Sequence, residues 1–308
     1  PRSTLFPYTT LFRSVINYVN KLGNVHVGNS NPVRIMGILN TSPESFYKKS
    51  ISTSRQRIVN AVHRMEDEGA DFIDVGGMST APYLSTMVSE KTEVSRIIKA
   101  VKIIQQASNL PISVDTCRSV IAREALELGV DIINDVTGLK YDHMMPKIIE
   151  KYRPSLVLCA YSKKTITGNQ LLKTKYLLRE SLEIAKSAKI YRTKIVLDPA
   201  IGFFRKKGRN SFFTKINSDW VKRDLLILEN LRSIKLNNPI LVSVSNKSFI
   251  GKILKKQNPS DRLAGSLAAE AVCVLNGADI IRTHNVSETR EAVTVAQKLS
   301  KTGKRLEL

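Results

Sequence analysis

Polar and charged side chains follow short apolar runs at seven places in this 308-residue chain, and their types suit a polar heterocyclic ligand. A carboxylate can bind an N–C–N edge with two hydrogen bonds, and an arginine can stack on a flat ring. Each residue alone could be a helix cap or a turn residue, but burying all of them together is costly unless a ligand pairs with them. In chain order they are Asn40, Asp74, Asp115, Asn134 with Asp135, Asp198, Lys247, and Arg282 with His284.

The same set includes groups for an anion and for a hard cation. Arg282 and His284 can hold an anionic leaving group, and Asn40 offers a neutral oxygen to Mg2+. The sequence has no HExxH, no P-loop and no Ser-His-Asp constellation, so other common chemistries lack their motifs. Three widely spaced cysteines without a CxxC pair argue against a zinc site or a disulfide framework. They suit a reducing cytoplasm, where we expect the protein to act.

Short apolar runs alternate with longer amphipathic segments from Val33 onward, which indicates a parallel sheet with helical connections. Strands are expected at 34–39, 72–75, 112–114, 132–134, 155–159, 195–197, 240–244 and 280–282, and helices at 54–68, 89–106, 118–128, 171–188, 221–234 and 261–276. Eight strand–helix units over roughly 250 residues predict a single-domain (β/α)8 TIM barrel with its site at the carboxyl ends of the strands. An open doubly wound sheet is the alternative, but no GxGxxG follows the first strand.

A repeated phrase supports the barrel. Gly69–Asp74, Gly129–Asn134 and Gly277–Arg282 share one pattern, Gly-apolar-Asp followed by an apolar pair and a polar residue. Each glycine follows an expected helix, where a left-handed cap needs no Cβ. The apolar pair opens the next strand, and the different polar endings fall where a barrel places its active site.

Composition along the chain divides it into four parts. Residues 1–14 are expected to be a non-native leader, residues 15–32 a linker, residues 33–295 the barrel domain and residues 296–308 a C-terminal tail. No apolar run approaches the roughly 20 residues that span a bilayer. The net charge of +21 suits anionic partners, but the basic residues are scattered without an RNA-binding motif. We therefore expect neither a membrane nor a nucleic acid as partner.

Eight motifs in chain order resemble the dihydropteroate synthase family, whose members are pterin-binding barrels of folate synthesis. The resemblance covers residues 33 to about 295 and rests on MGILNTSPESF, GADFIDVGGMST, ISVDT, IINDVTG, LDPAIGF, VSVSNKSFIG, DRLAGSLAA and GADIIRTHNV. It implies a transferase that joins hydroxymethyl-dihydropterin diphosphate to p-aminobenzoate or a related arylamine and releases diphosphate. It also implies Mg2+ as cofactor, and a homodimer is a possible assembly.

The resemblance further implies roles for ten residues. Asp115, Asn134 and Asp198 would hold the pterin edge, Lys247 would contact the ring carbonyl, Arg282 would pack over the ring, Asn40 would contact Mg2+, Thr80 and His284 would lie with Arg282 near the phosphates, and Phe203 and Ser248 would complete the substrate-binding set. The expected catalytic residues are Asp115, Asp198, Lys247 and Arg282. A neutral arylamine needs mainly positioning, so no general-base histidine is expected.

Two loops depart from the family pattern where the acceptor binds. The first, expected to be a mobile lid over 41–50, contains Lys48 and Lys49 where the family has an acidic stretch. The second reads STAPY over 79–83, without the usual arginine. This form resembles the archaeal branch, whose acceptor is an arylamine bearing a ribosyl phosphate, and the two lysines would suit that anion.

Two other functions remain open from the sequence. One is a pterin-dependent methyltransferase of the same barrel superfamily, and the other is a non-catalytic pterin-binding barrel. A methyl-tetrahydropterin would leave Lys247, Ser248 and Asn40 without the diphosphate and Mg2+ that they suit. This argument favours the synthase.

Overall fold

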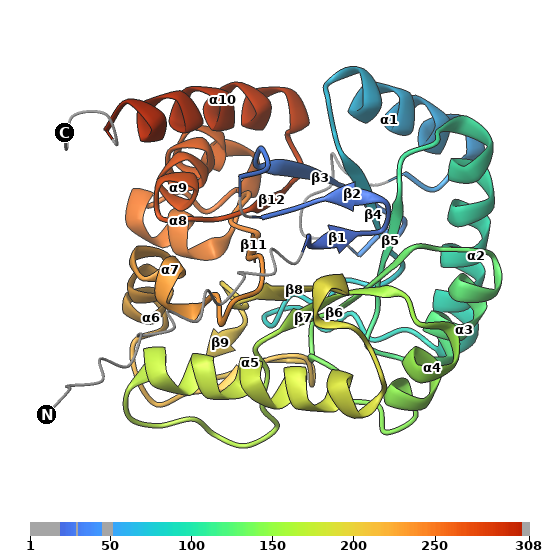
Figure 1. Ribbon diagram of the computed structural model, residues 1–308, viewed down its shortest axis with the longest axis horizontal. Helices are drawn as coiled ribbons and strands as arrows, with labels where there is room; N and C mark the ends of the chain where they lie inside the picture. Colours follow the sequence, from blue (N-terminus) through green and yellow to red (C-terminus); the bar gives the residue numbers. More distant parts are fainter. Residues whose placement is uncertain (1–18, 29, 45–51, 304–308) are drawn as a thin grey trace, which may run out of the picture.

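A closed barrel of eight parallel strands forms the body of the molecule, as the sequence predicts (Figure 1). The computed structural model describes residues 19–28, 30–44 and 52–303. The strand order is β11-β12-β3-β4-β5-β6-β7-β8, and a parallel bridge from Leu197 to Ile240 closes the ring. The strands are β3 (Arg34–Asn40), β4 (Phe72–Gly76), β5 (Ile112–Asp115), β6 (Ile132–Asp135), β7 (Ser155–Cys159), β8 (Ile195–Asp198), β11 (Leu241–Val242) and β12 (Ile280–Thr283).

Helices surround the barrel and connect its strands (Figure 1). They are α1 (Arg55–Asp67), α2 (Glu90–Ala107), α3 (Ser119–Glu127), α4 (Met145–Tyr152), α5 (Gln170–Ser187), α6 (Trp220–Glu229), α7 (Leu231–Ile234), α8 (Ser248–Leu254), α9 (Leu263–Leu275) and α10 (Val286–Gly303). Ser54, Ser89 and Asp219 cap α1, α2 and α6 by accepting backbone N–H groups of the first turn. The expected helix over 221–234 is divided at Asn230 into α6 and α7.

The repeated glycine–aspartate motif ends a helix and bonds to the start of a neighbouring strand. Gly69, Gly129 and Gly277 have φ of +84°, +83° and +101°, which confirms the left-handed caps. The aspartate two residues later accepts a backbone N–H at the start of the adjacent strand, in the pairs Asp71–Ile35 (2.8 Å), Asp131–Ile112 (3.1 Å) and Asp279–Ile240 (2.8 Å). The aspartates therefore fix strand register at the amino ends of the strands, away from the site.

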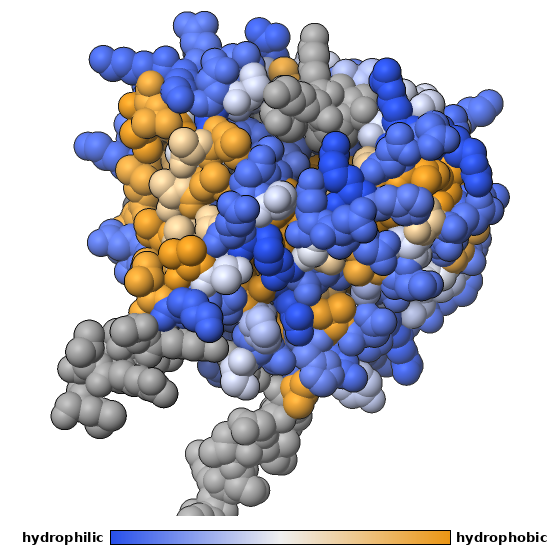
Figure 2. Space-filling model, turned by 90° about the horizontal axis from the view of Figure 1, so that it is seen from above, coloured by the Kyte–Doolittle hydropathy of each residue, from blue (hydrophilic) through white to orange (hydrophobic). Residues whose placement is uncertain are grey.

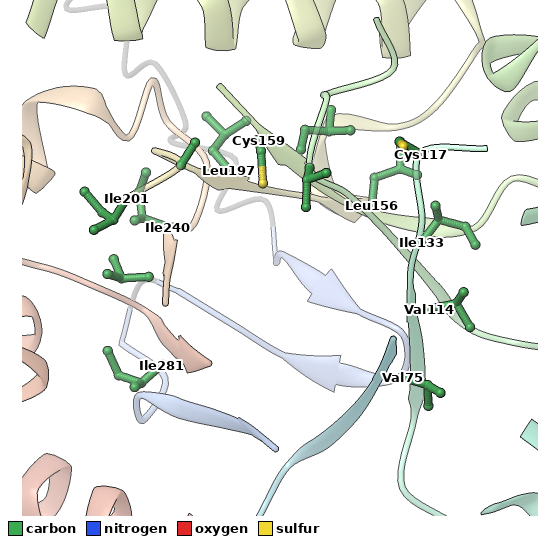
Figure 3. Packing of buried hydrophobic residues seen from close by; sticks show 14 of the residues in the cluster. Val75, Val114, Cys117, Ile133, Leu156, Cys159, Leu197, Ile201, Ile240 and Ile281 are labelled. Carbon is green, nitrogen blue, oxygen red and sulfur yellow. The ribbon is translucent and has the colours of Figure 1, made fainter. Parts of the chain in front are cut away.

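Alternate residues of each strand face the helices or the barrel interior. Val75, Val114 and Ile133 are fully buried, and Figure 3 shows them on neighbouring strands pointing away from the interior. The inward residues near the amino ends form a second apolar cluster, the barrel floor, which consists of Met36, Phe72, Ile132, Val157, Val196, Leu241 and Ile280 with Leu22 and Val27. This floor closes one end of the barrel and leaves the other end for polar groups.

The described part of the expected linker closes the floor from outside. β1 (Lys21–Leu22) and β2 (Val25–His26) form an antiparallel hairpin, which Figure 1 shows across the near end of the barrel. Leu22 and Val27 are fully buried in the floor. This segment is therefore a plug and not a linker.

The expected boundary after residue 295 falls inside α10, so residues 296–303 continue the last helix instead of forming a tail. The expected leader at 1–14 lies outside the described residues. Within the part of the chain that the structure describes, no helix is both long and apolar enough to cross a membrane.

Candidate active site

One cavity at the carboxyl ends of the strands gathers the residues that the sequence singles out. Its volume is about 840 Å3, open mouth included. All ten predicted site residues line it: Asn40, Thr80, Asp115, Asn134, Asp198, Phe203, Lys247, Ser248, Arg282 and His284. Their shared position is thus observed, while the role of each stays a prediction.

The strand period explains why these side chains meet. Several polar residues stand two positions after a floor residue and therefore face the same side of the sheet. The pairs are Phe72 and Asp74, Ile132 and Asn134, Val196 and Asp198, and Ile280 and Arg282. On these four strands the barrel interior consequently changes from an apolar floor to a polar mouth within two residues.

Arg282 is held between two carboxylates, one on β4 and one at the end of β5. Its Nε donates to Asp74 Oδ2 at 2.6 Å, and its Nη2 donates to Asp115 Oδ2 at 2.9 Å. Burial opposes the charge of Arg282, but the two carboxylates outweigh it and raise the pKa of the guanidinium. Arg282 is therefore always charged, and the orientation of its guanidinium is fixed.

Two aspartates that the sequence places in the mouth have structural roles instead. Asp74 is fully buried beneath the cavity, where it also accepts from Asn134 Nδ2 at 3.3 Å. Asp135 accepts the backbone N–H groups of Thr137 and Leu139 at 2.7 and 2.8 Å. Neither aspartate lines the cavity. Asp74 orients Arg282 and Asn134, which do line it, and Asp135 orients the loop that follows β6.

Two acceptor oxygens in the cavity wall have no hydrogen-bond partner among the described residues. Asp115 Oδ1 and Asn134 Oδ1 are shielded from solvent and accept no hydrogen bond within the described part of the chain. Burial raises the pKa of Asp115 to about 7, although Arg282 opposes this. Unsatisfied buried acceptors are costly, so a ligand that brings ring N–H groups to this wall would remove the cost.

A lysine and a carboxylate form the opposite wall. Asp198 Oδ1 accepts the backbone N–H of Ala200 at 2.6 Å. Lys247 Nζ donates to the carbonyl of Ile201 and lies 4.8 Å from the ring centroid of Phe203. Burial lowers the pKa of Lys247 to about 8 against the attraction of Asp198, and burial raises the pKa of Asp198 against the attraction of Lys247.

A buried ion pair supports the loop that carries Asp198. Arg223 is fully buried, pairs with Asp224 at 3.0 Å and donates to the carbonyl of Pro199 at 2.7 Å. Asp224 in turn accepts the backbone N–H of Gly202 at 3.0 Å. Because the pair bonds to backbone on both sides of Ile201, it positions the carbonyl that Lys247 contacts.

His284 contributes a neutral ring to the cavity. Burial, together with the nearby charges of Arg282 and Lys247, lowers its pKa to about 3. Its Nδ1 lies 3.0 Å from Ser245 Oγ. A contact between His284 and an anion is therefore a hydrogen bond, and the positive charge beside His284 comes from Arg282 and Lys247.

Hydrogen bonds across the barrel mouth hold the second loop, residues 79–83, to the segment after β8. The sequence does not predict these contacts. Asn210 Nδ2 donates to the carbonyl of Ala81 at 2.8 Å, and the backbone N–H of Arg209 donates to the carbonyl of Pro82 at 2.7 Å. These partners follow β8, where β9 (Phe204–Arg205) and β10 (Thr214–Lys215) form a short parallel pair. The contacts hold Thr80 and Tyr83 in the cavity wall.

The base of the first loop is fastened to α2. Glu44 forms two hydrogen bonds with the Arg96 guanidinium, at 3.0 and 3.1 Å, and Arg96 also donates to the carbonyl of Gly77. The Arg96 bonds lower the pKa of Glu44 to about 2. The rest of the expected lid, with Lys48 and Lys49, lies outside the described residues.

Comparison with known proteins identifies the family of this chain. The profile of the family described as "Pterin binding enzyme" matches residues 36–284. The dihydropteroate synthase of Clostridium beijerinckii is 34% identical over 274 residues, which cover 88% of this chain and 96% of that protein. The chain belongs to the dihydropteroate synthase family of pterin-binding enzymes.

Solved structures of this family have the same fold. A dihydropteroate synthase from Clostridium difficile, in the presence of pteroic acid, is 34% identical, with a TM-score of 0.76 over 87% of this chain and 97% of that one. Another from Coxiella burnetii, in complex with pteroic acid, is 32% identical with a TM-score of 0.78. It covers 92% of this chain and 99% of that one. The TIM barrel and the family predicted from the sequence are both confirmed.

Proposed function

We propose that this cavity carries out the condensation after which its family is named, joining 6-hydroxymethyl-dihydropterin diphosphate to an arylamine with release of diphosphate. The observation that carries the proposal is a pair of buried acceptors, Asp115 Oδ1 and Asn134 Oδ1, that no described residue satisfies. Asp198 and Lys247 line the same cavity. A pterin edge presents ring and amino N–H groups to such acceptors and a ring carbonyl to a lysine.

The reaction breaks one C–O bond and forms one C–N bond. Diphosphate leaves the hydroxymethyl carbon with the bonding electrons, and the positive charge left on that carbon spreads into the pterin ring. Arg282, held by its two carboxylates, and the Lys247 ammonium stabilise the negative charge that develops on the leaving group. The neutral arylamine attacks the carbon and then loses one proton, so the chain supplies position more than base catalysis.

Mg2+ is proposed as the cofactor, and Asn40 would be its contact on the protein. The Asn40 side chain lines the cavity at the end of β3, and a neutral amide oxygen is a donor that Mg2+ accepts. No group of three or more His, Cys, Asp or Glu that could hold a metal occurs among the described residues. This donor set fits an ion held mainly by substrate phosphate and water, where it would neutralise phosphate charge.

The test of the function is a condensation assay on purified protein. We expect pterin diphosphate and p-aminobenzoate to give diphosphate and dihydropteroate in equal amounts. Methyl transfer from a methyl-tetrahydropterin to a corrinoid, without diphosphate release from the first substrate, would favour the methyltransferase. Including an arylamine with a ribosyl phosphate separates the two acceptors that the loop sequences suggest.

A homodimer is proposed from an apolar face on one side of the barrel. Figure 2 shows hydrophobic surface gathered on the left flank, where Figure 1 places α6, α8, α9 and α10. The exposed apolar side chains on these helices are Leu225, Leu226, Ile253, Leu254, Val272, Leu275, Val295 and Leu299. A contiguous apolar face of this kind typically marks a protein interface, and a second copy of the chain is the commonest partner.

The dimer is tested by molar mass in solution. Wild-type protein should have the mass of two chains in light scattering after size exclusion, and Val272→Asp should shift it to one. Leu172→Asp is the matched control, because Leu172 is 60% exposed on α5, away from this face. Monomeric wild-type protein would contradict the proposal.

A cytoplasmic location is proposed from the thiols. Cys117, Cys159 and Cys273 are all buried and free, and such cysteines suit a reducing compartment.

A further inference from the structure

A buried carboxyl group lies behind the end of β12, outside the cavity described above. Glu270 is on α9, is fully buried and does not line the cavity. Its Oε2 accepts a hydrogen bond from Thr289 Oγ1 at 2.8 Å. Its Oε1 is shielded from solvent and has no hydrogen-bond partner among the described residues.

No cation balances this carboxyl group. None of the ion pairs in the described part of the chain includes Glu270. Burial raises the pKa of Glu270 to about 7, although hydrogen bonds from Thr289 and Thr283 oppose this. A buried carboxyl without a counter-charge is costly for stability, and costs of this kind are typical of groups that serve a site.

Two threonine hydroxyls connect Glu270 with the turn that follows β12. Thr289, on α10, has its Oγ1 2.9 Å from Thr283 Oγ1 at the end of the strand. Thr283 Oγ1 also accepts the backbone N–H of Asn285 at 3.1 Å. Because His284 stands between Thr283 and Asn285, these bonds fix the backbone that carries its ring into the cavity.

The same face of α9 supports a second segment of the cavity. Ser266 stands four residues before Glu270, so both side chains lie on one helix face. Ser266 Oγ accepts the backbone N–H of Asn246 at 2.9 Å, and Asn246, with φ of +55°, directly precedes Lys247. The buried polar face of α9 therefore holds the backbone beside two of the cavity residues.

His284 depends on such support more than Arg282 does. The His284 ring is neutral, so its contact with an anion is a hydrogen bond, which weakens steeply when its angle is wrong. Arg282 is oriented by its own bonds to Asp74 and Asp115 and needs no help from α9. Loss of Glu270 should therefore affect the contact of His284 selectively.

We propose that Glu270 is a positioning residue, which acts through Thr289 and Thr283 to aim His284 at the diphosphate of the pterin substrate. This inference rests on the proposed function, because it takes the first substrate to carry a diphosphate.

The test compares the binding of two pterins by calorimetry, in the presence of Mg2+ and without an arylamine. The ligands are 6-hydroxymethyl-dihydropterin diphosphate and 6-hydroxymethyl-dihydropterin, and the ratio of their affinities measures the contribution of the diphosphate. In Glu270→Ala we expect this ratio to fall about 3- to 10-fold, the range for weakening of one hydrogen bond. The affinity for the alcohol should change less than about twofold.

Two further variants separate positioning from a general structural effect. Glu270→Gln retains an oxygen that can accept from Thr289 and should recover most of the loss. Glu183→Ala, the control at an exposed glutamate of α5, should bind both ligands as wild type does.

A double-mutant cycle shows whether Glu270 acts through His284. Once His284→Ala has removed the ring, adding Glu270→Ala should change the affinity ratio less than about twofold. A loss that is the same with and without His284 would overturn the proposal, as would an unchanged ratio in Glu270→Ala.

The inference and the proposed function can fail separately. Wild-type protein that shows these binding differences but forms no dihydropteroate with p-aminobenzoate supports the role of Glu270 and contradicts the condensation alone. Wild-type protein that condenses the two substrates while Glu270→Ala binds both pterins normally contradicts the role of Glu270 alone.

Discussion

Replacing Arg282 with methionine should destabilise the protein in a pH-dependent way. The guanidinium stands between Asp74, which is fully buried, and Asp115, whose side chain is 11% exposed. Its loss leaves two carboxylates together without a counter-charge. Breaking a buried ion pair on one side costs about 3–5 kcal/mol, and we expect a loss of that size near pH 8.

The pH dependence follows from the proton on Asp115. Burial already raises the pKa of Asp115 to about 7, while the unfolded value lies near 3.9. The folded state thus binds the proton that the unfolded state has released, so stability falls as pH rises towards 7. From about pH 6 to about pH 8 this costs wild type about 1.4 kcal/mol. Without Arg282 the pKa rises further, and the cost over the same interval grows towards its limit of about 2.7 kcal/mol.

Urea unfolding at the two pH values measures the difference. The destabilisation caused by Arg282→Met should be larger near pH 8 than near pH 6, by up to about 1.4 kcal/mol. In Arg282→Met with Asp115→Asn this extra loss should vanish, because the titrating group is gone. A destabilisation that is the same at both pH values, with Asp115 intact, would refute the proposed coupling of the two residues.

Further predictions concern pH, metal and the first loop. Affinity for a neutral pterin should rise as Asp115 ionises near pH 7 and fall as Lys247 loses its charge near pH 8. Calorimetric titration across this pH range measures the affinity, and an affinity that does not change with pH would refute the prediction. Turnover should stop in excess EDTA and return with Mg2+, while the protein without diphosphate binds Mg2+ weakly; full activity in EDTA would remove the metal role of Asn40. Glu44→Gln should raise KM for the arylamine several-fold with little change in melting temperature, because the Arg96 bonds are partly exposed. An unchanged KM would show that this clamp does not position the loop.

The fold could be predicted because its signals are local. Strand periodicity and the three glycine caps are short-range patterns, and they place the strands to within a residue or two of their observed ends. The plug has a local signal too, because Gly23-Asn24 between two short strands is a hairpin turn pattern. Each of its strands has only two residues, which is too short for a strand period to be recognised in the sequence.

The site could be predicted only in part because its details depend on distant partners. Asp74 and Asp198 have the same local pattern, yet Asp74 is a buried support because Arg282, distant in sequence, reaches it from a strand that pairs with β3. Arg205 lies in a basic run that reads as surface charge, and only the fold turns it into the cavity. The contact between Asn210 and Ala81 has no sequence signal at all.

The central claim is that the strand-end cavity is a pterin site, and calorimetric titration with 6-hydroxymethylpterin tests it most directly. Wild-type protein should bind one pterin per chain. Asp198→Ala should lose at least about 100-fold in affinity, because a charge-assisted contact is replaced by unpaired ring donors. Asp67→Ala, at an exposed position on α1, is the control and should bind as wild type. Equal binding by Asp198→Ala and wild type, or no binding by wild type, would contradict the claim.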